Sequence, residues 1–338
     1  MSSFAFPTIS LSVLTCCATA LTVIIGRALI PKKYVNLGGK YVVITGCDSG
    51  FGALSAADIA KRTGALVIAL CLTDAGCQAA LASGAYRAIK CNFLNPEEIE
   101  RAADEIKRIC SGSLWAIVHN AGICYAGPID FQPQENFRRT MEVNFFAMAN
   151  LNQRLMPCIK ATAGRVILIT SVEGLVVTPL VTSYAASKFA CEAFAQGLRA
   201  ESCHWGINVC VINPSTMKTN IVAGFYESLR SSWNAMDKID PTGLWKQEWS
   251  KEWLDFVITK GTKDVQDLAE DPVIVVRDIY DAVANVTPRI RYLSGAAAKT
   301  IYYFLWVCPE SWTSAFTKSL ISPKPTILSG PSFIAMRK

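Results

Sequence analysis

The sequence has little histidine, no paired-cysteine motif and no block of like charge. Two histidines, His119 and His204, occur among 338 residues, so a histidine-rich metal site is excluded and a Ser-His-Asp triad would have to use one of them. His119 falls in an apolar strand pattern, where a packing role is expected. The thirteen cysteines are scattered and never take the C-x-x-C spacing of zinc or redox sites. Reduced, mostly buried thiols are therefore expected.

No run of five or more like charges accompanies the formal net charge of +6. Nucleic-acid binding needs a basic patch or stripe, and we therefore expect no nucleic-acid partner. With 51% apolar residues over 338 positions, the chain is long enough for one α/β domain of roughly 250 residues with extensions, or for two ordinary domains.

Residues 1–30 are predicted to form a membrane anchor. No charged residue occurs from Ser2 to Gly26, and Arg27, Lys32 and Lys33 follow. An uncharged stretch of this length can span a bilayer, and the positive charge behind it places the bulk of the chain on the cytosolic side. A cleaved targeting segment is the alternative, although the basic n-region of a signal peptide is missing.

Beyond Gly39, short β-branched runs alternate with longer helical patterns. The predicted strands are Tyr41–Thr45, Leu66–Leu70, Trp115–His119, Arg165–Thr170 and Asn208–Ile212. The predicted helices are Ala53–Arg62, Pro96–Ile109, Gln134–Ile159 and Ser183–His204. Strands that are apolar throughout are typical of parallel sheets covered on both faces. We therefore predict an α/β fold, a doubly wound parallel sheet of Rossmann type, with ligands at the carboxyl ends of the strands.

Residues 220–262 break this alternation. Trp245, Trp249 and Trp253 recur every four residues, a spacing that would place them on one face of a helix. Such a stripe usually belongs to a core, and the alternative is an apolar lid over a lipophilic substrate. Further on, Ala296–Cys308 is too short to span a membrane. It is predicted to be a buried or interfacial helix within a C-terminal helical extension, 296–338.

A glycine-rich turn follows the first predicted strand directly. Its residues include Thr45, Gly46, Ser49, Gly50, Phe51 and Gly52. Glycines there let the backbone turn sharply and bring the pyrophosphate of a dinucleotide to the amino end of the next helix, where free N–H groups favour negative charge. The place of the turn, between the first strand and the first helix, predicts a dinucleotide cofactor.

The spacing of this turn, T-G-x-x-x-G-x-G, resembles the opening motif of the short-chain dehydrogenase/reductase family. The family's N-A-G motif is matched by Asn120, Ala121 and Gly122 at the end of a predicted strand. By this resemblance the three residues support the central sheet and line the cofactor cleft. The resemblance extends from about residue 39 to about 295, and a single catalytic domain is expected over 38–295 with a substrate lid at about 220–262.

The cofactor is predicted to be NAD. Between Leu70 and Tyr86 no Lys or Arg occurs, and Asp74 is the one charged residue. A 2′-phosphate needs a basic partner, whereas a free ribose hydroxyl suits an acidic or neutral one. Asp74 could instead be a solvated loop residue. Asn92 stands where the family usually has an acidic residue near the adenine, and its carbonyl could accept from the adenine amino group.

Tyr184 and Lys188 lie one turn apart in the predicted helix Ser183–His204 and share one face of it. A tyrosine hydroxyl titrates near pH 10 in water, and a fixed ammonium nearby favours its ionised form. Lowering its pKa by about three units requires roughly 4 kcal/mol, which Lys188 and the cofactor's charge would supply together. The residues between the two are small and keep the helix close to the cofactor.

The family's Y-x-x-x-K motif is matched by Tyr184 and Lys188, its active-site serine by Ser171, and its helix asparagine by Asn144. The resemblance implies that Tyr184 is the acid/base and that Ser171 hydrogen-bonds the reacting oxygen. It also implies that Lys188 holds the nicotinamide ribose and lowers the tyrosine pKa, while Asn144 supports a water-mediated proton path.

The family's P-G-x-x-x-T loop is matched by Pro214 and Thr219, with Ser215 where glycine is usual. The resemblance places this loop beside the nicotinamide, where Thr219 would contact the carboxamide.

The stretches TGCDSGFG, MEVNFFA, SYAASKFACEAF and HWGINVCVINP resemble one branch of the family. This branch contains 17β-hydroxysteroid dehydrogenase type 2, 11β-hydroxysteroid dehydrogenase type 2, the retinol dehydrogenases and 3-hydroxybutyrate dehydrogenase, and the two steroid enzymes are the most similar. The resemblance implies NAD-dependent oxidation of a lipophilic alcohol, above all a hydroxysteroid, at the endoplasmic reticulum membrane. It also implies a homodimer paired through the predicted helices Gln134–Ile159 and Ser183–His204.

Other functions stay open. Retinol is an alternative substrate, while 3-hydroxybutyrate would need a cationic clamp that the sequence does not show. A non-catalytic NAD-binding relative would be expected to lose Tyr184 or Lys188, and both are present. Isomerases and dehydratases built on the same scaffold tend to use nucleotide sugars, which suit an anchored chain with a tryptophan-rich lid poorly.

Overall fold

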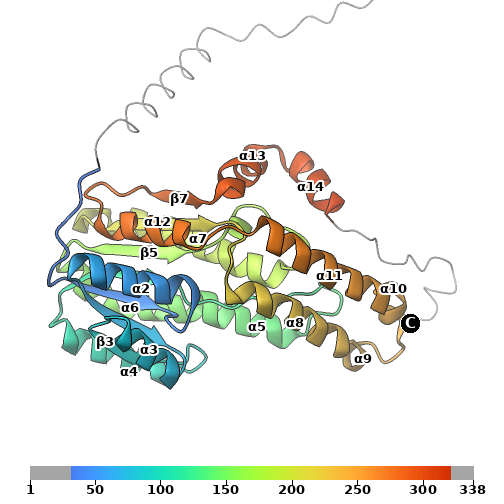
Figure 1. Ribbon diagram of the computed structural model, residues 1–338, viewed down its shortest axis with the longest axis horizontal. Helices are drawn as coiled ribbons and strands as arrows, with labels where there is room; N and C mark the ends of the chain where they lie inside the picture. The colour runs from blue at the N-terminus through green and yellow to red at the C-terminus, as the bar shows by residue number, and fades with distance from the viewer. Residues whose placement is uncertain (1–31, 321–338) are drawn as a thin grey trace, which may run out of the picture.

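A seven-stranded parallel sheet forms the centre of the computed structural model, which describes residues 32–320. The strand order is β3-β2-β1-β4-β5-β6-β7. Figure 1 shows β3 and β7 at opposite edges of the sheet, with β5 between them. The strands are β1 (Tyr41–Thr45), β2 (Leu66–Cys71), β3 (Arg87–Lys90), β4 (Leu114–His119), β5 (Arg165–Ile169), β6 (Asn208–Pro214) and β7 (Arg291–Ser294). The doubly wound fold and all five predicted strands are confirmed.

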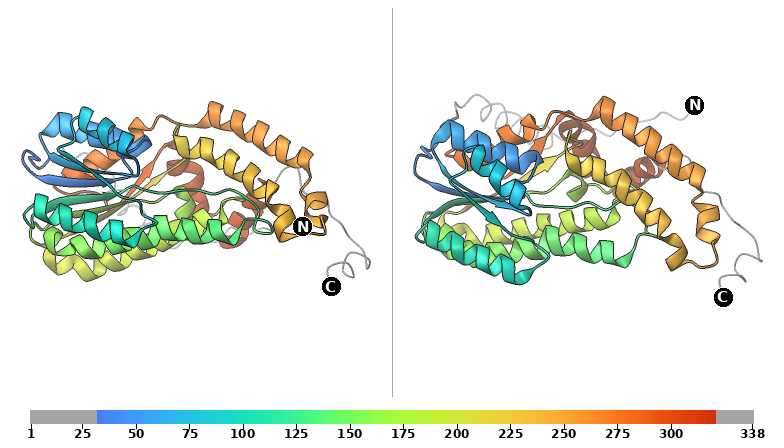
Figure 2. Two further views of the ribbon diagram at one scale, coloured as in Figure 1. Left: turned by 90° about the horizontal axis from the view of Figure 1, so that it is seen from below. Right: turned by 60° about the horizontal axis from the view of Figure 1, so that its bottom comes forward.

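Helices cover both faces of the sheet, as the apolar strands require. One face carries α2 (Gly50–Thr63), α3 (Asp74–Ala82) and α12 (Val273–Ala284). The other carries α4 (Pro96–Ile109), α5 (Gln134–Met141), α6 (Ala147–Lys160) and α7 (Thr182–Ser202) (Figure 2). Strand β5 is buried along its whole length, so the sheet is shielded from water on both sides.

The sequence pattern misses four of these elements, β3, β7, α3 and α12. The strands β3 and β7 have only four residues each, and both lie at the edges of the sheet. Edge strands are partly exposed and show no continuous apolar run, so they resemble loops in the sequence. The helix α3 is short and rich in Ala and Gly, and it therefore lacks a clear apolar stripe.

The strand order reverses between β1 and β4, which are neighbours in the sheet but not in the chain. A crevice opens at such a point because the helices that follow the two strands leave to opposite faces. The carboxyl ends of β1 and β4 carry the glycine turn and the N-A-G motif. The fold thus brings the two predicted cofactor motifs together.

The predicted helix Gln134–Ile159 is two α-helices joined by a π-helical turn. Helix α5 ends at Met141, the π-helical turn η1 covers Glu142–Phe146, and α6 follows without a break in direction. Such turns are rare and are often found at functional sites. Here the turn contains Asn144, one of the predicted site residues.

Residues 220–268 form an arm of four helices beyond the carboxyl edge of the sheet (Figure 2). They are α8 (Asn220–Asn234), α9 (Met236–Ile239), α10 (Leu244–Glu248) and α11 (Lys251–Leu268). The prediction that three tryptophans share one continuous helix is wrong. Trp249 lies between α10 and α11, where the Ser250 side chain caps α11 by accepting from the Trp253 backbone N–H.

The tryptophans pack inside the arm rather than over a ligand. Trp249 and Trp253 are buried, with ring centroids 4.8 Å apart, and they pack with Phe131 and Leu229. Trp233 and Trp245 lie at the border of the same cluster. The core interpretation of these residues is therefore the correct one, and other side chains of the arm face the cavity described below.

The C-terminal extension begins directly after β7. It contains the π-helical turn η4 (Ala298–Tyr302), α13 (Tyr303–Val307) and α14 (Glu310–Ser319). The predicted helix Ala296–Cys308 is thus present, with Leu305 buried and Phe304 exposed.

The N-terminal anchor predicted over 1–30 lies outside the described residues. Across 32–320, no helix has both the length and the apolar character that crossing a membrane demands.

Candidate active site

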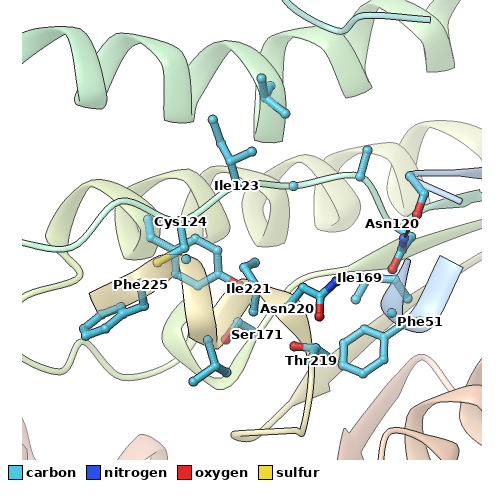
Figure 3. Close-up of a pocket in the computed structure, with 18 of the residues that line it drawn as sticks. Phe51, Asn120, Ile123, Cys124, Ile169, Ser171, Thr219, Asn220, Ile221 and Phe225 are labelled. Atoms are coloured by element: carbon cyan, nitrogen blue, oxygen red, sulfur yellow. Dashed lines mark hydrogen bonds between the residues drawn. The ribbon is translucent and has the colours of Figure 1, made fainter. Parts of the chain in front are cut away.

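A cavity of about 810 Å³ lies at the carboxyl ends of the parallel strands. It is lined by the segments that follow β1 to β6, by residues of α5, α7 and α8, and by Val265 and Tyr302 from later segments. Figure 3 shows Phe51, Thr219 and Asn120 toward one end, with Cys124 and Phe225 toward the other and Ser171 between them. Cavities of this size hold cofactors and drug-sized molecules.

The glycine turn fits tightly against the end of β4. Gly46 has a φ of +72°, and a Cβ there would lie 2.8 Å from the Ala121 Cα. A Cβ on Gly52 would lie 2.2 Å from the Gly46 carbonyl oxygen and 2.6 Å from the Asn120 side-chain nitrogen. Neither position admits a side chain. Both residues must therefore be glycine for the turn to pack against the end of β4.

Hydrogen bonds tie this turn to the N-A-G motif. The Thr45 hydroxyl accepts from the backbone N–H groups of Asn120 and Ala121, both at 2.9 Å. The Asn120 side chain donates to the carbonyls of Thr45 (2.8 Å) and Gly46 (3.2 Å). Thr45 and Gly52 therefore support the cavity from behind, without lining it.

The amino end of α2 is open toward the cavity. Ser49, Gly50 and Phe51 line the cavity, and the Ser49 side chain makes no capping hydrogen bond to the helix. The first-turn N–H groups of α2 thus remain available for a diphosphate. Together with Asn120, Ala121 and Gly122, which also line the cavity, these residues fit the dinucleotide that the sequence predicts.

The structure does not bring Asp74 into this group. Asp74 begins α3, is exposed, and pairs with Lys90 at 2.6 Å. The carboxylate at the end of β2 belongs to Asp48 instead, which lines the cavity and accepts from the N–H groups of Leu72 (2.7 Å) and Thr73 (3.0 Å). Asp48 was not among the predicted residues, because it lies within the glycine turn, far from β2 in the chain.

Asn92 lines the cavity as predicted. Its side-chain carbonyl accepts from the Leu94 N–H at 3.0 Å. A carbonyl oxygen has two lone pairs, so one acceptor site remains for an adenine amino group.

Lys188 is buried next to the tyrosine that it was predicted to serve. Both residues line the cavity from α7. The Lys188 ammonium donates to the Ile169 carbonyl at the end of β5 (2.9 Å) and lies 5.4 Å from the centroid of the Tyr184 ring. Since the side chain is only 5% exposed, this one hydrogen bond orients the ammonium toward the cavity.

Burial shifts the pKa values of Tyr184 and Lys188 in the directions that favour their neutral forms. It raises the pKa of Tyr184 well above its usual value, while a hydrogen bond with Ser171 acts in the opposite direction. Burial also lowers the pKa of Lys188. The expected lowering of the tyrosine pKa is therefore not produced by the protein alone, because desolvation outweighs its neighbours.

Ser171 follows β5 directly and lines the cavity. Its hydroxyl accepts from the Glu173 N–H at 3.1 Å. The preceding residue, Thr170, donates to the Glu192 carboxylate (2.8 Å), and Asn213 donates to the same oxygen (2.6 Å) and to the Ser171 carbonyl (3.0 Å). Arg291 completes this network by pairing with Glu192 at 2.7 Å, so the end of β5 is held from two sides.

Asn144 is buried behind the cavity. Its side chain accepts from the Ile123 N–H (2.8 Å) and donates to the Ile123 carbonyl (3.0 Å) and the Ser187 hydroxyl (2.9 Å). A Cβ on Gly122 would come within 3.3 Å of the Asn144 oxygen and 3.5 Å of the Lys188 nitrogen. Asn144 therefore fixes the loop segment that follows the N-A-G motif beside Lys188.

The loop from Pro214 to Thr219 lines the cavity at both of these residues. Ser215 replaces the usual glycine without strain: its N–H donates to the backbone of β7 (3.0 Å) and its hydroxyl to Glu270 (3.1 Å). Thr219 precedes α8 and makes no side-chain cap to it. Its hydroxyl is therefore available to a ligand.

His119 takes no part in the cavity lining. It is buried beside Asn152, and burial lowers its pKa to about 4, so the ring is neutral at physiological pH. In residues 32–320, no group of three His, Cys, Asp or Glu side chains is arranged to hold a metal ion.

Sequence analysis also missed three polar groups at the end of the cavity beyond Ser171. They are Cys124, Glu173 and Tyr302. Glu173 is buried, accepts from the Thr178 N–H (2.9 Å) and hydroxyl (2.7 Å), and has its pKa raised to about 7 by burial. A lone acidic residue in the apolar stretch SVEGLVV was the available signal for it.

The raised pKa of Glu173 makes stability depend on pH. The folded-state pKa of about 7 exceeds the usual 4.5, so ionisation of this carboxyl group destabilises the fold. The destabilisation is absent below pH 4.5, grows between pH 4.5 and pH 7, and is complete above pH 7. The Glu173→Gln variant removes the charge, and its amide can still accept from the Thr178 N–H and donate to the Thr178 hydroxyl. We expect it to match the wild type at pH 4.5 and to be more stable by roughly 3 kcal/mol at pH 8.

Denaturant unfolding at several pH values measures this difference. The Glu135→Gln variant, at the exposed start of α5, serves as the control. Its stability relative to the wild type should not increase between pH 4.5 and pH 8. An equal stability difference at pH 4.5 and pH 8 would contradict the assignment.

Residues 40–229 match the family model for short chain dehydrogenases. Human short-chain dehydrogenase/reductase family 9C member 7 is 31% identical, over 86% of this chain and 92% of that protein. Mouse retinol dehydrogenase 7 is 34% identical, over 81% of this chain and 86% of that protein. Human dehydrogenase/reductase SDR family member 9 is 29% identical, over 89% of this chain and 93% of that protein.

A solved short-chain dehydrogenase from Streptomyces avermitilis shares the fold, with a TM-score of 0.63 at 21% identity over 83% of this chain and 96% of that one. The family model covers more than half of the chain, and the related sequences extend along most of its length. The chain therefore belongs to the short-chain dehydrogenase/reductase family, as its motifs predict.

Proposed function

We propose that the protein oxidises a hydroxyl group on a lipophilic alcohol with NAD, and that the alcohol is a hydroxysteroid. The observation that carries this proposal is the meeting of Ser171, Tyr184 and Lys188 in one cavity, next to a glycine turn that fits a dinucleotide. A relative that only bound NAD would not need this catalytic group.

In this reaction Tyr184 takes the proton of the substrate hydroxyl as the carbon–hydrogen bond breaks. Ser171 hydrogen-bonds the same oxygen, because its hydroxyl lies beside that of Tyr184. The nicotinamide, when bound, supplies the hydride acceptor and a positive charge. The two electrons leave with the hydride, the alcohol becomes a ketone or an aldehyde, and Tyr184 holds the remaining proton.

Lys188 keeps Tyr184 able to accept that proton. Its ammonium, fixed by the Ile169 carbonyl, would bind the nicotinamide ribose and stabilise the phenolate. Asn144, through Ser187 and Ile123, holds the neighbouring backbone and would support a path of water molecules for the released proton.

The carboxylate of Asp48 supports the choice of NAD. It lies at the end of β2, where the ribose of a dinucleotide is bound in this fold. A negative charge there repels a 2′-phosphate and accepts from a free hydroxyl. Arg139 and Lys188 are the cationic residues that line the cavity in the described part of the chain, and Lys188 is assigned to the nicotinamide side.

The side chains beyond Ser171 support a lipophilic substrate. Phe225 lies toward this end of the cavity (Figure 3), and Ile123, Val222 and Val265 also line the cavity. Burying apolar surface against these side chains drives binding. A small anion such as 3-hydroxybutyrate would leave this surface unused. Retinol is the second candidate, because two of the similar proteins are named retinol dehydrogenase 7 and retinol dehydrogenase 16.

Replacing Tyr184 tests this proposal. We expect Tyr184→Phe to lower kcat by a factor of about 10³, since a general base contributes roughly 10² to 10⁴, while NADH binding stays unchanged. Membranes that carry the full chain are incubated with NAD or NADP and a panel of steroids and retinol, and absorbance of the reduced cofactor is followed.

The Tyr86→Phe variant is the control, since Tyr86 lies at the sheet edge beside Arg87. Full activity of Tyr184→Phe would exclude the mechanism. Equal rates with NADP would exclude the role given to Asp48.

We further propose that the protein acts at the endoplasmic reticulum membrane, with the catalytic domain on the cytosolic side and with the C-terminal helices against the lipid. Large apolar side chains are exposed together on this segment, at Ile301, Tyr303, Phe304, Val307, Trp312 and Phe316. Aromatic residues are favoured at the lipid–water interface. The uncharged segment from Ser2 to Gly26 belongs to the same chain and would hold these helices at the surface.

Quenching by brominated lipids measures this contact. In vesicles that contain the full chain, brominated acyl chains should quench the fluorescence of Trp312, so that Trp312→Phe removes part of the quenching. The Trp205→Phe variant, which changes an exposed tryptophan after α7, should leave it unchanged. Equal effects of the two variants would exclude the lipid contact.

A homodimer is proposed through α5, α6 and α7. Phe146, Phe189 and Trp205 are exposed on or beside these helices, and a second copy would cover them. A monomeric mass by light scattering in detergent would contradict this pairing.

A further inference from the structure

Two polar side chains at the substrate end of the cavity have no role in the proposed reaction. Glu173 lies two residues after Ser171 and is 9% exposed. Tyr302 comes from the C-terminal extension and packs with the buried residues Leu175, Val176 and Leu305. The other residues that the cavity takes from α8 and α11 at this end are mostly apolar.

Glu173 and Tyr302 lie close enough to influence each other. The charge of Glu173 contributes to the raised pKa values of Tyr302, Tyr184 and Cys124. These three groups and Lys188 line the cavity from η4, α7 and the loop after β4, and further titratable side chains in the lining include Tyr125, Arg139 and Tyr226. The carboxyl group thus shares one cavity with the catalytic tyrosine and with Tyr302.

Both groups keep unused hydrogen-bonding capacity. Each carboxyl oxygen of Glu173 accepts one hydrogen bond, both from Thr178, and a carboxylate offers about four acceptor sites. Within residues 32–320, the Tyr302 hydroxyl has no hydrogen-bond partner. If Glu173 only held the loop at Thr178, an uncharged glutamine would do so without the cost of burying a charge.

We propose that Glu173 and Tyr302 form a polar subsite that binds a second hydroxyl group of the substrate. The inference rests on the proposed function and narrows the substrate to a lipophilic diol. A hydroxyl group has one donor and two acceptor sites, so it can donate to Glu173 and accept from Tyr302 at once. Retinol has a single hydroxyl group and cannot fill the subsite while its alcohol reacts at Tyr184.

A matched pair of steroids tests the subsite. One is a diol, and the other is the mono-alcohol that lacks only the hydroxyl remote from the reacting one. A site built to hydrogen-bond a hydroxyl discriminates against an analogue without it, because its polar groups are left unpaired. We expect kcat/KM of the full chain to favour the diol at least about tenfold, mainly through KM.

Tyr302→Phe removes one hydroxyl and keeps the ring that packs on Leu305. It should reduce the preference for the diol to less than about threefold. Glu173→Gln leaves a single uncharged carbonyl oxygen, which accepts from the Thr178 N–H, in place of the carboxylate, so it should reduce the preference as well. Tyr303→Phe is the matched control, since Tyr303 is 47% exposed on the next position of the chain, and it should keep the wild-type preference.

A binding measurement separates failure of the subsite from failure of the proposed function. The thermal shift caused by each steroid is measured with NADH present, for the wild type and for both variants. A larger shift with the diol, lost in Tyr302→Phe and Glu173→Gln, supports the subsite even if neither steroid is oxidised. Equal shifts and equal KM values in the wild type, or a preference that survives both substitutions, would overturn it.

Discussion

The burial of Tyr184 and Lys188 under the end of β5 is the constraint on which the site depends. Removing these groups from water favours the neutral phenol and lowers the pKa of the lysine, which favours its neutral amine. The tyrosine is therefore a poor base until further positive charge enters the cavity. A bound nicotinamide in its oxidised form would supply such charge, so the acidity of Tyr184 is expected to depend on the cofactor.

The rest of the fold keeps this pair in place. The Ile169 carbonyl holds the Lys188 ammonium. Glu192, paired with Arg291, holds Thr170 directly and the Ser171 carbonyl through Asn213. Arg291 also stacks on Trp306 of the C-terminal extension, 5.0 Å from its ring. The extension thus contributes to the same site twice, through this contact and through Tyr302.

Local sequence patterns predicted most of the fold and the catalytic residues. Buried parallel strands have continuous apolar sequences, and motifs at the ends of β1, β4 and β5 meet because parallel strands share one carboxyl edge. Asp74 shows the limit of that approach, since proximity to the end of β2 in the chain did not place it in the cavity. Asp48 takes that place through a turn that folds back from β1, a contact between segments distant in the sequence.

The helix predicted from the tryptophan spacing was wrong for a different reason. A repeat of four residues suggested one helix, but a break at Trp249 divides it, and the indoles pack on each other instead of a substrate. Glu173 and Tyr302 are brought together by the path of the C-terminal extension, which residue spacing does not reveal. Such contacts depend on tertiary packing, and they decide which side chains a substrate meets.

The ionisation of Tyr184, measured with and without oxidised NAD, tests the central claim most directly. Ultraviolet difference titrations of the wild type and of Tyr184→Phe isolate the signal of this phenol. The account predicts that its pKa lies above 10 in the protein alone and falls by about three units when oxidised NAD binds, a change of roughly 4 kcal/mol. A phenol that ionises at the same pH in both states would contradict it.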